Sequence, residues 1–327
     1  MTARLLEIDR LSVAFNDERG SVHAVDQLSF DVAPGETLAI VGESGSGKTA
    51  TALAMLRLIP PHQGGIIGGA VRFAGVDLAT LREHEIERVR GAGIGMIFQE
   101  PMTSLNPVMR IGDQIAEPLM QHRKLDRAAA RARARELLGL VRIPDPDESL
   151  DAYPHQFSGG MRQRAMIAMA VACDPKLLIA DEPTTALDVT VQAQMLRLLG
   201  ELAERRGMAM VLITHDLAVV AEIADRVVVM YAGRGIESGP VDRVLARPIH
   251  PYTRGLIGAS IARGSRGRVR RLTEIPGIVP VMREIAGGCG FVERCAQAEA
   301  RCRLGRPADL VFPDSRSAAC VRGRELV

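Results

Sequence analysis

The sequence lacks two features that would carry the chain into or across a membrane by itself. Among its 327 residues, the longest apolar runs, such as residues 167–173, fall well short of the roughly 18 residues that a spanning helix needs. The N-terminal segment MTARLLEIDR has no apolar stretch after its charged residues, which argues against a secretory signal. We therefore expect a soluble chain that serves a membrane, if at all, by docking to other subunits.

A large net charge is missing as well. Lys and Arg number 41 against 39 Asp and Glu, so the net charge is +2 and no global field draws the chain onto nucleic acid. Hydrophobic residues make up 47% and charged residues 24%, which predicts an ordered chain with a sizeable core. The arginine-rich residues 124–140 are strong helix formers without interleaved aromatics, so we interpret their charges as a solvated helix face.

Short strands alternate with helical segments along most of the chain. Residues 37–41 form a continuous apolar run, which is typical of a buried parallel strand. The other strands predicted from the sequence are residues 5–13, 22–32, 177–180, 209–214 and 226–231. Strand signals are absent between about residues 100 and 169, which indicates a helical insertion into an α/β core with a mostly parallel sheet.

Glycine-rich positions mark the expected loops. We interpret the pairs Gly64-Gly65 and Gly68-Gly69 as loop residues. Residues 259–272, rich in Arg, Gly and Ser, are predicted to be a linker.

Residues 42–49 read GESGSGKT and match the P-loop pattern GxxxxGK[ST] between a buried strand and a helix. Glycines let backbone N–H groups turn toward phosphate oxygens, and the helix N-terminus adds partial positive charge. Lys48 is expected to reach the β- and γ-phosphates and Thr49 to bind Mg²⁺. The predicted ATP-binding residues here are Gly42, Glu43, Ser44, Gly45, Ser46, Gly47, Lys48 and Thr49.

Two adjacent carboxylates end a later apolar strand. Asp181 and Glu182 follow the run KLLIA, at the strand end where α/β sheets bind ligands. Asp181 is expected to hold Mg²⁺, and Glu182 to polarise the attacking water as a general base.

Four further segments complete a set of motifs in a fixed order. They are Gln99 in MIFQEP, FSGGMRQ at residues 157–163, ALD at residues 186–188, and His215 in ITHD. They resemble the Q-loop, signature, D-loop and switch histidine of the ABC-type ATPases, over about residues 4–245. The resemblance implies an α/β P-loop NTPase core with an N-terminal antiparallel β subdomain, an inserted helical subdomain at about residues 100–168, and a small C-terminal extension. The expected boundaries are residues 1–247 for the ATPase domain and 248–327 for the extension.

The resemblance also implies roles for single residues. Gln99 is expected to contact Mg²⁺ and the attacking water, and His215 to bridge the γ-phosphate and Glu182. Asp188 is expected at the nucleotide site. Phe15 resembles the aromatic that stacks on adenine, with a place in the core as the alternative.

The signature residues are expected to act across a dimer. In the family they face the γ-phosphate held by the other ATPase, so they would complete the ATP site of the partner. These residues are Ser158, Gly159, Gly160 and Gln163. Ser158 is also expected to cap the helix that follows it.

The exact residues of these motifs and of further segments resemble those of the oligopeptide/dipeptide/nickel importer ATPases. It includes QEPMTSLNP at residues 99–107, YPHQ at residues 153–156, HPYT at residues 250–253 and IPG at residues 275–277. This implies ATP hydrolysis that powers peptide import at the cytoplasmic face of the inner membrane. The implied partners are a second ABC ATPase in a heterodimer, two permease subunits and an extracytoplasmic solute-binding protein, with no nucleic acid.

Other functions compete with this interpretation. One is the same role for nickel or another solute, since ATPase subunits do not touch the cargo. Another is a soluble ABC ATPase that acts on nucleic acid or ribosomes, but those usually carry two cassettes or long coiled-coil insertions. A metal-sensing regulator would leave the intact ATPase motifs unexplained.

The cysteines are unevenly placed. Cys173 stands alone and is predicted to be a small core residue. The others, Cys289, Cys295, Cys302 and Cys320, lie in the last forty residues, a pattern that favours a metal site over disulfides. The resembling ATPases carry a similar tail with an iron–sulfur cluster, so a [4Fe–4S] cluster is favoured over Zn²⁺, with free thiols as the third option.

The resemblance also locates a docking surface. In ABC ATPases the permease contacts the groove beside the Q-loop, where residues 100–118 supply Met102, Leu105 and Met109. These apolar side chains either face the permease or pack inside the helical subdomain.

Overall fold

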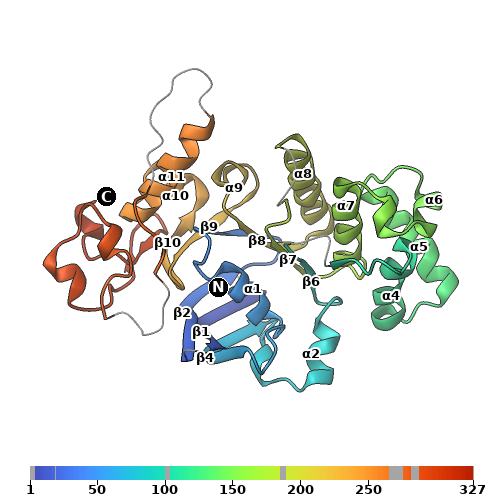
Figure 1. Ribbon diagram of the computed structural model, residues 1–327, viewed down its shortest axis with the longest axis horizontal. Helices are drawn as coiled ribbons and strands as arrows, with labels where there is room; N and C mark the ends of the chain where they lie inside the picture. Colours follow the sequence, from blue (N-terminus) through green and yellow to red (C-terminus); the bar gives the residue numbers. More distant parts are fainter. Residues whose placement is uncertain are drawn as a thin grey trace. The chain divides into compact units, whose positions relative to one another are not determined.

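The computed structural model describes residues 4–18, 20–99, 104–184, 189–264, 275–280 and 287–326. Two compact units can be distinguished (Figure 1). The helical unit is formed mainly by Thr80–Leu212, and the P-loop unit by Arg4–Val32, Thr37–Ala79 and the chain from Ile213 onward.

The elements follow one another in a mixed α/β order. The strands are β1 (Leu6–Asp17), β2 (Gly20–Val32), β3 (Thr37–Val41), β4 (Gly64–Phe73), β5 (Val76–Asp77), β6 (Ile94–Ile97), β7 (Leu177–Asp181), β8 (Ala209–Thr214), β9 (Arg226–Tyr231), β10 (Arg234–Pro240), β11 (Leu310–Val311) and β12 (Ser317–Ala318). The helices are α1 (Lys48–Met55), α2 (Glu83–Val89), α4 (Ile111–Arg123), α5 (Arg127–Leu140), α6 (Pro146–Asp151), α7 (Gly159–Ala170), α8 (Val189–Arg206), α9 (Leu217–Ile223), α10 (Val241–Ala246) and α11 (Pro251–Gly264).

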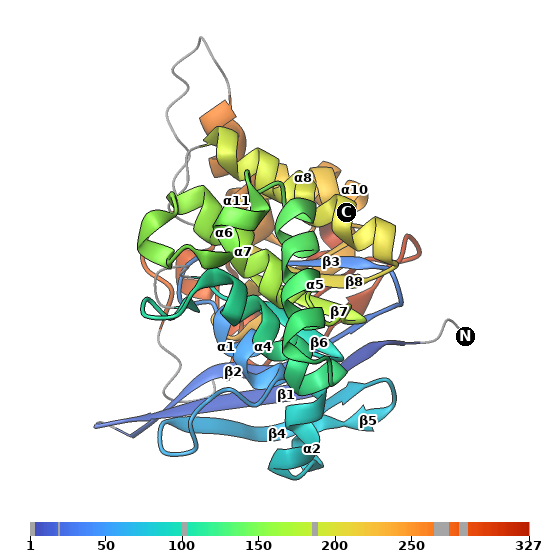
Figure 2. The same ribbon diagram turned by 90° about the vertical axis from the view of Figure 1, so that its right-hand side faces the viewer.

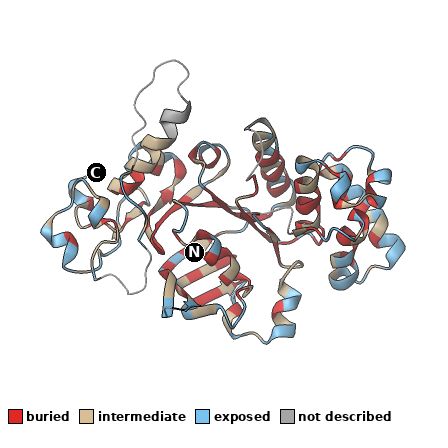
Figure 3. Cartoon of the chain, viewed as in Figure 1, coloured by how far each residue is buried: buried red, intermediate tan, exposed pale blue. Residues whose placement is uncertain are grey.

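An antiparallel sheet opens the P-loop unit, with strand order β2-β1-β4-β5 (Figure 2). Buried and partly buried positions alternate along most of β1 because one face of this sheet covers the core more fully than the other (Figure 3). The glycine pairs expected in loops lie inside β4 instead. Gly69 is required there because a Cβ would stand 2.3 Å from the carbonyl oxygen of Arg10, where the register of β1 shifts.

The second sheet of the P-loop unit carries the nucleotide motif. Its strands lie in the order β11-β12-β10-β9-β3, and β3 pairs with β9 in parallel. All five residues of β3 are buried, as the continuous apolar run predicts for a strand covered on both faces.

The helical unit contains the predicted insertion. Helices α4, α5, α6 and α7 pack against one another, while β6 pairs with β7 in parallel. Helix α5 begins at the Asp126 cap and buries Ala130 and Leu137, whereas its arginines form ion pairs with carboxylates such as Asp147 and Asp151. The arginine-rich segment is therefore a solvated helix face, as predicted.

The C-terminal extension is attached to the P-loop unit. Strand β12 pairs with β10, and Phe291 is 4% exposed with its ring centroid 5.2 Å from that of Tyr231 and 5.4 Å from that of Tyr252. The linker predicted at residues 259–272 was partly wrong, because α11 continues to Gly264. Its remaining residues before Ile275 lie outside the described residues.

Candidate nucleotide site

The P-loop joins β3 to α1. Gly47 precedes the helix with φ of 99°, and a Cβ there would stand 2.2 Å from the carbonyl oxygen of Ala24, so only glycine fits. The side chain of Thr49 is exposed in the first helical turn. This is the strand–loop–helix context that the sequence motif requires.

Lys48 is held inside the loop. Its side chain is 5% exposed, and Nζ donates to the carbonyl oxygens of Gly42 at 2.8 Å and Glu43 at 3.0 Å. Ser44 and Gly45 are exposed, whereas Ser46 is buried and its Oγ has no hydrogen-bond partner among the described residues. The loop thus presents a cationic side chain and a stretch of accessible backbone, which suits a phosphate group.

A cavity of about 500 Å³ opens beside the loop. Its walls combine four segments of the P-loop unit: Val22, His23 and Ala24 of β2; Glu43, Ser44 and Gly45 of the P-loop; Ala232 and Gly233; and residues 277–280 of the extension. The extension therefore forms part of the wall next to the nucleotide motif.

The carboxylate predicted to be the general base lies in the helical unit beside its predicted neighbour in sequence. Asp181 is 2% exposed at the end of β7, and Glu182 follows it with φ of 44°. Gln99 Nε2 donates to Glu182 Oε2 at 3.3 Å. The fold thus brings Gln99 into contact with Glu182, the predicted base, although the two residues are 83 positions apart in the sequence. The sequence alone did not predict this contact.

The signature segment begins α7. Ser158 Oγ accepts a hydrogen bond from the backbone N–H of Met161 at 3.3 Å, so the predicted helix cap is confirmed. Ser158 and Gly159 are exposed. A Cβ on Gly160 would stand 3.4 Å from Val191 Cγ1, an ordinary contact, so packing among the residues that the structure describes does not require glycine there.

The side chain of Gln163 lies inside the single chain, and its role at the partner's ATP site stays a prediction. Its side chain is fully buried, and neither amide atom has a hydrogen-bond partner among the described residues. Because Gln163 lies one turn inside α7, its amide is withdrawn from the surface that Ser158 and Gly159 present.

The remaining predicted site residues are His215, Phe15 and Asp188. His215 follows β8 and is exposed, and Phe15 lies near the end of β1, paired with Val22, where it is only half-buried. A fully buried core place for Phe15 is therefore not observed. Asp188 lies outside the described residues.

The cysteines of the extension surround one small cavity. Cys289, Cys295, Cys302 and Cys320 all line it, and its volume is about 20 Å³, room for about one water molecule. Burial raises the pKa of the thiols of Cys289, Cys295 and Cys320, and the neighbouring cysteines add to this effect for Cys289 and Cys320. Across the described ranges, no three His, Cys, Asp or Glu side chains are gathered closely enough to hold a metal ion.

Cys173 behaves as the small core residue that was predicted. It is 1% exposed, and its Sγ donates to the carbonyl oxygen of Pro118 at 3.4 Å. It lies in the turn after α7, not on the helix itself.

Both the ATPase part and the C-terminal extension of the chain match models of known protein families. Residues 25–185 match the model of the ABC transporter family, and residues 236–302 match that of the oligopeptide/dipeptide transporter C-terminal region. A probable peptide ABC transporter ATP-binding protein of Sinorhizobium fredii is 52% identical over 99% of this chain and 96% of the relative. The chain belongs to the ATP-binding proteins of ABC transporters, in the oligopeptide/dipeptide group.

Other comparisons agree with this family. A putative peptide import ATP-binding protein of Brucella abortus is 50% identical over 98% of this chain and 95% of the relative. The dimeric ATP-binding cassette solved with ADP and Pi is 25% identical, with a TM-score of 0.65 over 72% of this chain and 98% of that one. The predicted fold class is confirmed, and this ABC ATP-binding protein is an ATPase.

Two residues beside the P-loop were missed as site residues. Tyr252 Oη accepts a hydrogen bond from the backbone N–H of Glu43 at 2.8 Å, and Arg294 forms an ion pair with the Glu43 carboxylate at 2.7 Å. Tyr252 lies in the HPYT segment, which resembles the importer ATPases but did not by itself indicate a site residue. Arg294 belongs to no recognisable sequence motif and is notable in the sequence only because it precedes Cys295.

Proposed function

We propose that this chain hydrolyses ATP to power the import of peptides across a membrane. The observation that carries the proposal is that the sequence similarity extends over nearly the whole chain. Relatives named as peptide ABC transporter or peptide import ATP-binding proteins match both the ATPase part and the extension, with about 50% identical residues. The described helices contain none that is long and apolar enough to cross a membrane. Because its relatives are named as peptide import ATP-binding proteins, we propose that the chain works with membrane-spanning partners.

The proposed assembly has the composition expected for such importers. This chain and a second ABC ATPase, as a heterodimer, bind two permease subunits at the cytoplasmic face of the membrane, and a solute-binding protein delivers the peptide. Purification of the tagged chain from membranes tests this assembly. Recovery of two permeases and peptide-stimulated ATPase activity would support it, whereas stimulation by nickel alone would reassign the cargo.

The ATP site is proposed to use the P-loop together with the other segments that resemble ABC motifs. Lys48 and the backbone of residues 42–49 bind the phosphates, while Thr49, Asp181 and Gln99 supply oxygen ligands of the kind that Mg²⁺ prefers. Glu182 takes a proton from the attacking water, and the hydrogen bond from Gln99 orients its carboxylate. His215 and Asp188 are proposed to complete the site, and Phe15 to stack on adenine; its half-buried ring supports the last role.

The signature is proposed to act in trans. The exposed Ser158 and Gly159 and the free N–H groups at the start of α7 form a surface that attracts an anion. Because packing among the described residues does not demand glycine at position 160, we attribute that glycine to the close approach of the partner's nucleotide.

The extension is proposed to bind a [4Fe–4S] cluster through its four cysteines. Their thiols line a single cavity, and the donor set suits iron–sulfur chemistry. The cavity of about 20 Å³ is small, so the thiols would have to spread outward around a cluster. No group of thiols close enough to hold a metal ion is gathered among the residues described, so a zinc ion, like the cluster, would require the cysteines to move.

A further inference from the structure

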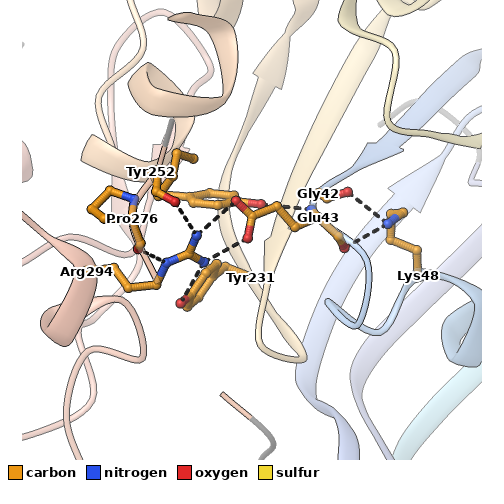
Figure 4. A network of polar contacts seen from close by, with 8 residues as sticks. Gly42, Glu43, Lys48, Tyr231, Tyr252, Pro276 and Arg294 are labelled. Atoms are coloured by element: carbon orange, nitrogen blue, oxygen red, sulfur yellow. Dashed lines mark hydrogen bonds and ion pairs between the residues drawn. The ribbon is translucent and has the colours of Figure 1, made fainter. Parts of the chain in front are cut away.

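Arg294 connects the extension to the P-loop. Its side chain is only 7% exposed, and it donates to both carboxylate oxygens of Glu43, at 2.7 and 3.2 Å (Figure 4). A bidentate pair between a guanidinium and a carboxylate is directional and strong for a partly buried ion pair. The Glu43 side chain is 27% exposed, so solvent screens this pair less than it screens an ordinary surface pair.

The same guanidinium also fixes the wall of the cavity. Arg294 Nε donates to the carbonyl oxygen of Pro276 at 2.7 Å, and Nη2 donates to that of Ile275 at 3.1 Å (Figure 4). Its carbon Cζ lies 5.6 Å from the ring centroid of Tyr231, which is within range of a cation–π contact. The segment that these bonds hold continues into residues 277–280, which line the cavity.

Glu43 carries this connection to the phosphate-binding lysine. Its backbone N–H donates to Tyr252 Oη, and its carbonyl oxygen accepts from Lys48 Nζ (Figure 4). A carboxylate that lines the cavity beside a phosphate site repels a nucleoside triphosphate unless a cation neutralises it. Arg294 supplies that cation from the extension.

We infer that Arg294 is a positioning residue for nucleotide binding: it neutralises and holds Glu43, and so couples the state of the extension to the affinity of the P-loop for a nucleoside triphosphate. The inference rests on the proposed ATP site. Coupling of this kind is reciprocal, so bound nucleotide also stabilises the extension.

Equilibrium titration of the full chain with a fluorescent ATP analogue and Mg²⁺ tests the coupling. Arg294→Gln should weaken binding about ten-fold at low salt, within the usual range for coupled sites. Glu43→Gln added to that variant should restore most of the affinity, because it removes the unpaired carboxylate. A purely structural loss at Arg294 would not be rescued by a change in the P-loop.

Matched variants separate the outcomes. Arg303→Gln removes an ion pair of the same extension with Glu293, which is 73% exposed, and should leave affinity unchanged. Arg294→Lys keeps the charge without the fork and should weaken binding about three-fold, which covers the case in which Arg294→Gln does not fold. Nucleotide should also slow tryptic cleavage of the extension in the unchanged chain but not in Arg294→Gln.

Two results would overturn these ideas in different ways. Unchanged affinity in Arg294→Gln and Arg294→Lys, with binding abolished in Lys48→Ala, would reject the coupling and leave the ATP site intact. Full affinity in Lys48→Ala would reject the proposed ATP site itself.

Discussion

Gln99 and Glu182 come from separate segments of the helical unit, and the amide of Gln99 donates to the carboxylate of Glu182 at 3.3 Å. Glu182 directly follows Asp181, the proposed magnesium ligand, in the sequence. The residue proposed to contact Mg²⁺ and the proposed general base are therefore in direct contact, so we expect a substitution at one to affect the other.

Replacement of the base separates binding from chemistry. Glu182→Gln preserves the size of the side chain but cannot accept a proton, so ATP hydrolysis should fall by about 10² to 10⁴ while ATP binding persists. Steady-state phosphate release and nucleotide titration measure the two effects. Gln99→Ala is the companion variant and should lower turnover less. Near-normal turnover of Glu182→Gln in the assembled transporter would exclude its role as base.

The trans arrangement is tested with mixed assemblies. Ser158→Arg places a charged side chain on the exposed surface at the start of α7 and should impair the site whose P-loop belongs to the partner. Lys48→Ala should impair the site of this chain itself. Photo-crosslinking of a labelled nucleotide to each subunit tells the sites apart, and loss at the same site in both variants would contradict the dimer proposal.

Docking to the permease should depend on Val108, not on Leu105. Leu105 is 3% exposed and so belongs to the interior of the helical unit, whereas Val108 is 79% exposed; Met102 lies outside the described residues. Val108→Asp should release the chain from membranes with its melting temperature unchanged. Leu105→Asp should instead destabilise the fold by about 3 kcal/mol or more, because it buries an unpaired charge.

The control for this prediction is Ile67→Asp on β4, since Ile67 is likewise an exposed apolar side chain at 56%. Membrane flotation with thermal melting measures both effects. Retention of Val108→Asp on membranes would show that the contact lies elsewhere.

The proposed cluster of the extension should be lost when one of its four proposed cysteine ligands is replaced. Anaerobically purified protein should contain about four irons per chain, as a Cys₄-bound [4Fe–4S] cluster requires. Cys295→Ser should lower the iron content and speed proteolysis of the extension, because ligation also orders the segment. Cys173→Ser is the matched control, since that thiol is buried in the helical unit. Zinc in place of iron, or no metal in the unchanged protein, would refute the cluster.

The sequence by itself determined the regular core. Strands β3, β8 and β9 have the bounds expected from their apolar runs. A strand that is buried on both faces needs apolar residues at nearly every position, so its sequence marks where it begins and ends. The P-loop was equally plain, since Gly47 and Lys48 are dictated by local backbone geometry and charge. The cap at Ser158 followed from the same local chemistry.

Tertiary structure decided the rest. Gly69 belongs to a strand because it opposes the irregular register of β1, and Gln163 is buried although Ser158 and Gly159 of the same segment are exposed. The pair of Glu43 and Arg294 spans 251 positions, and neither residue has a local pattern that predicts the other. Contacts at such separations depend on how the extension packs through Phe291 onto Tyr231 and Tyr252, which no local propensity encodes.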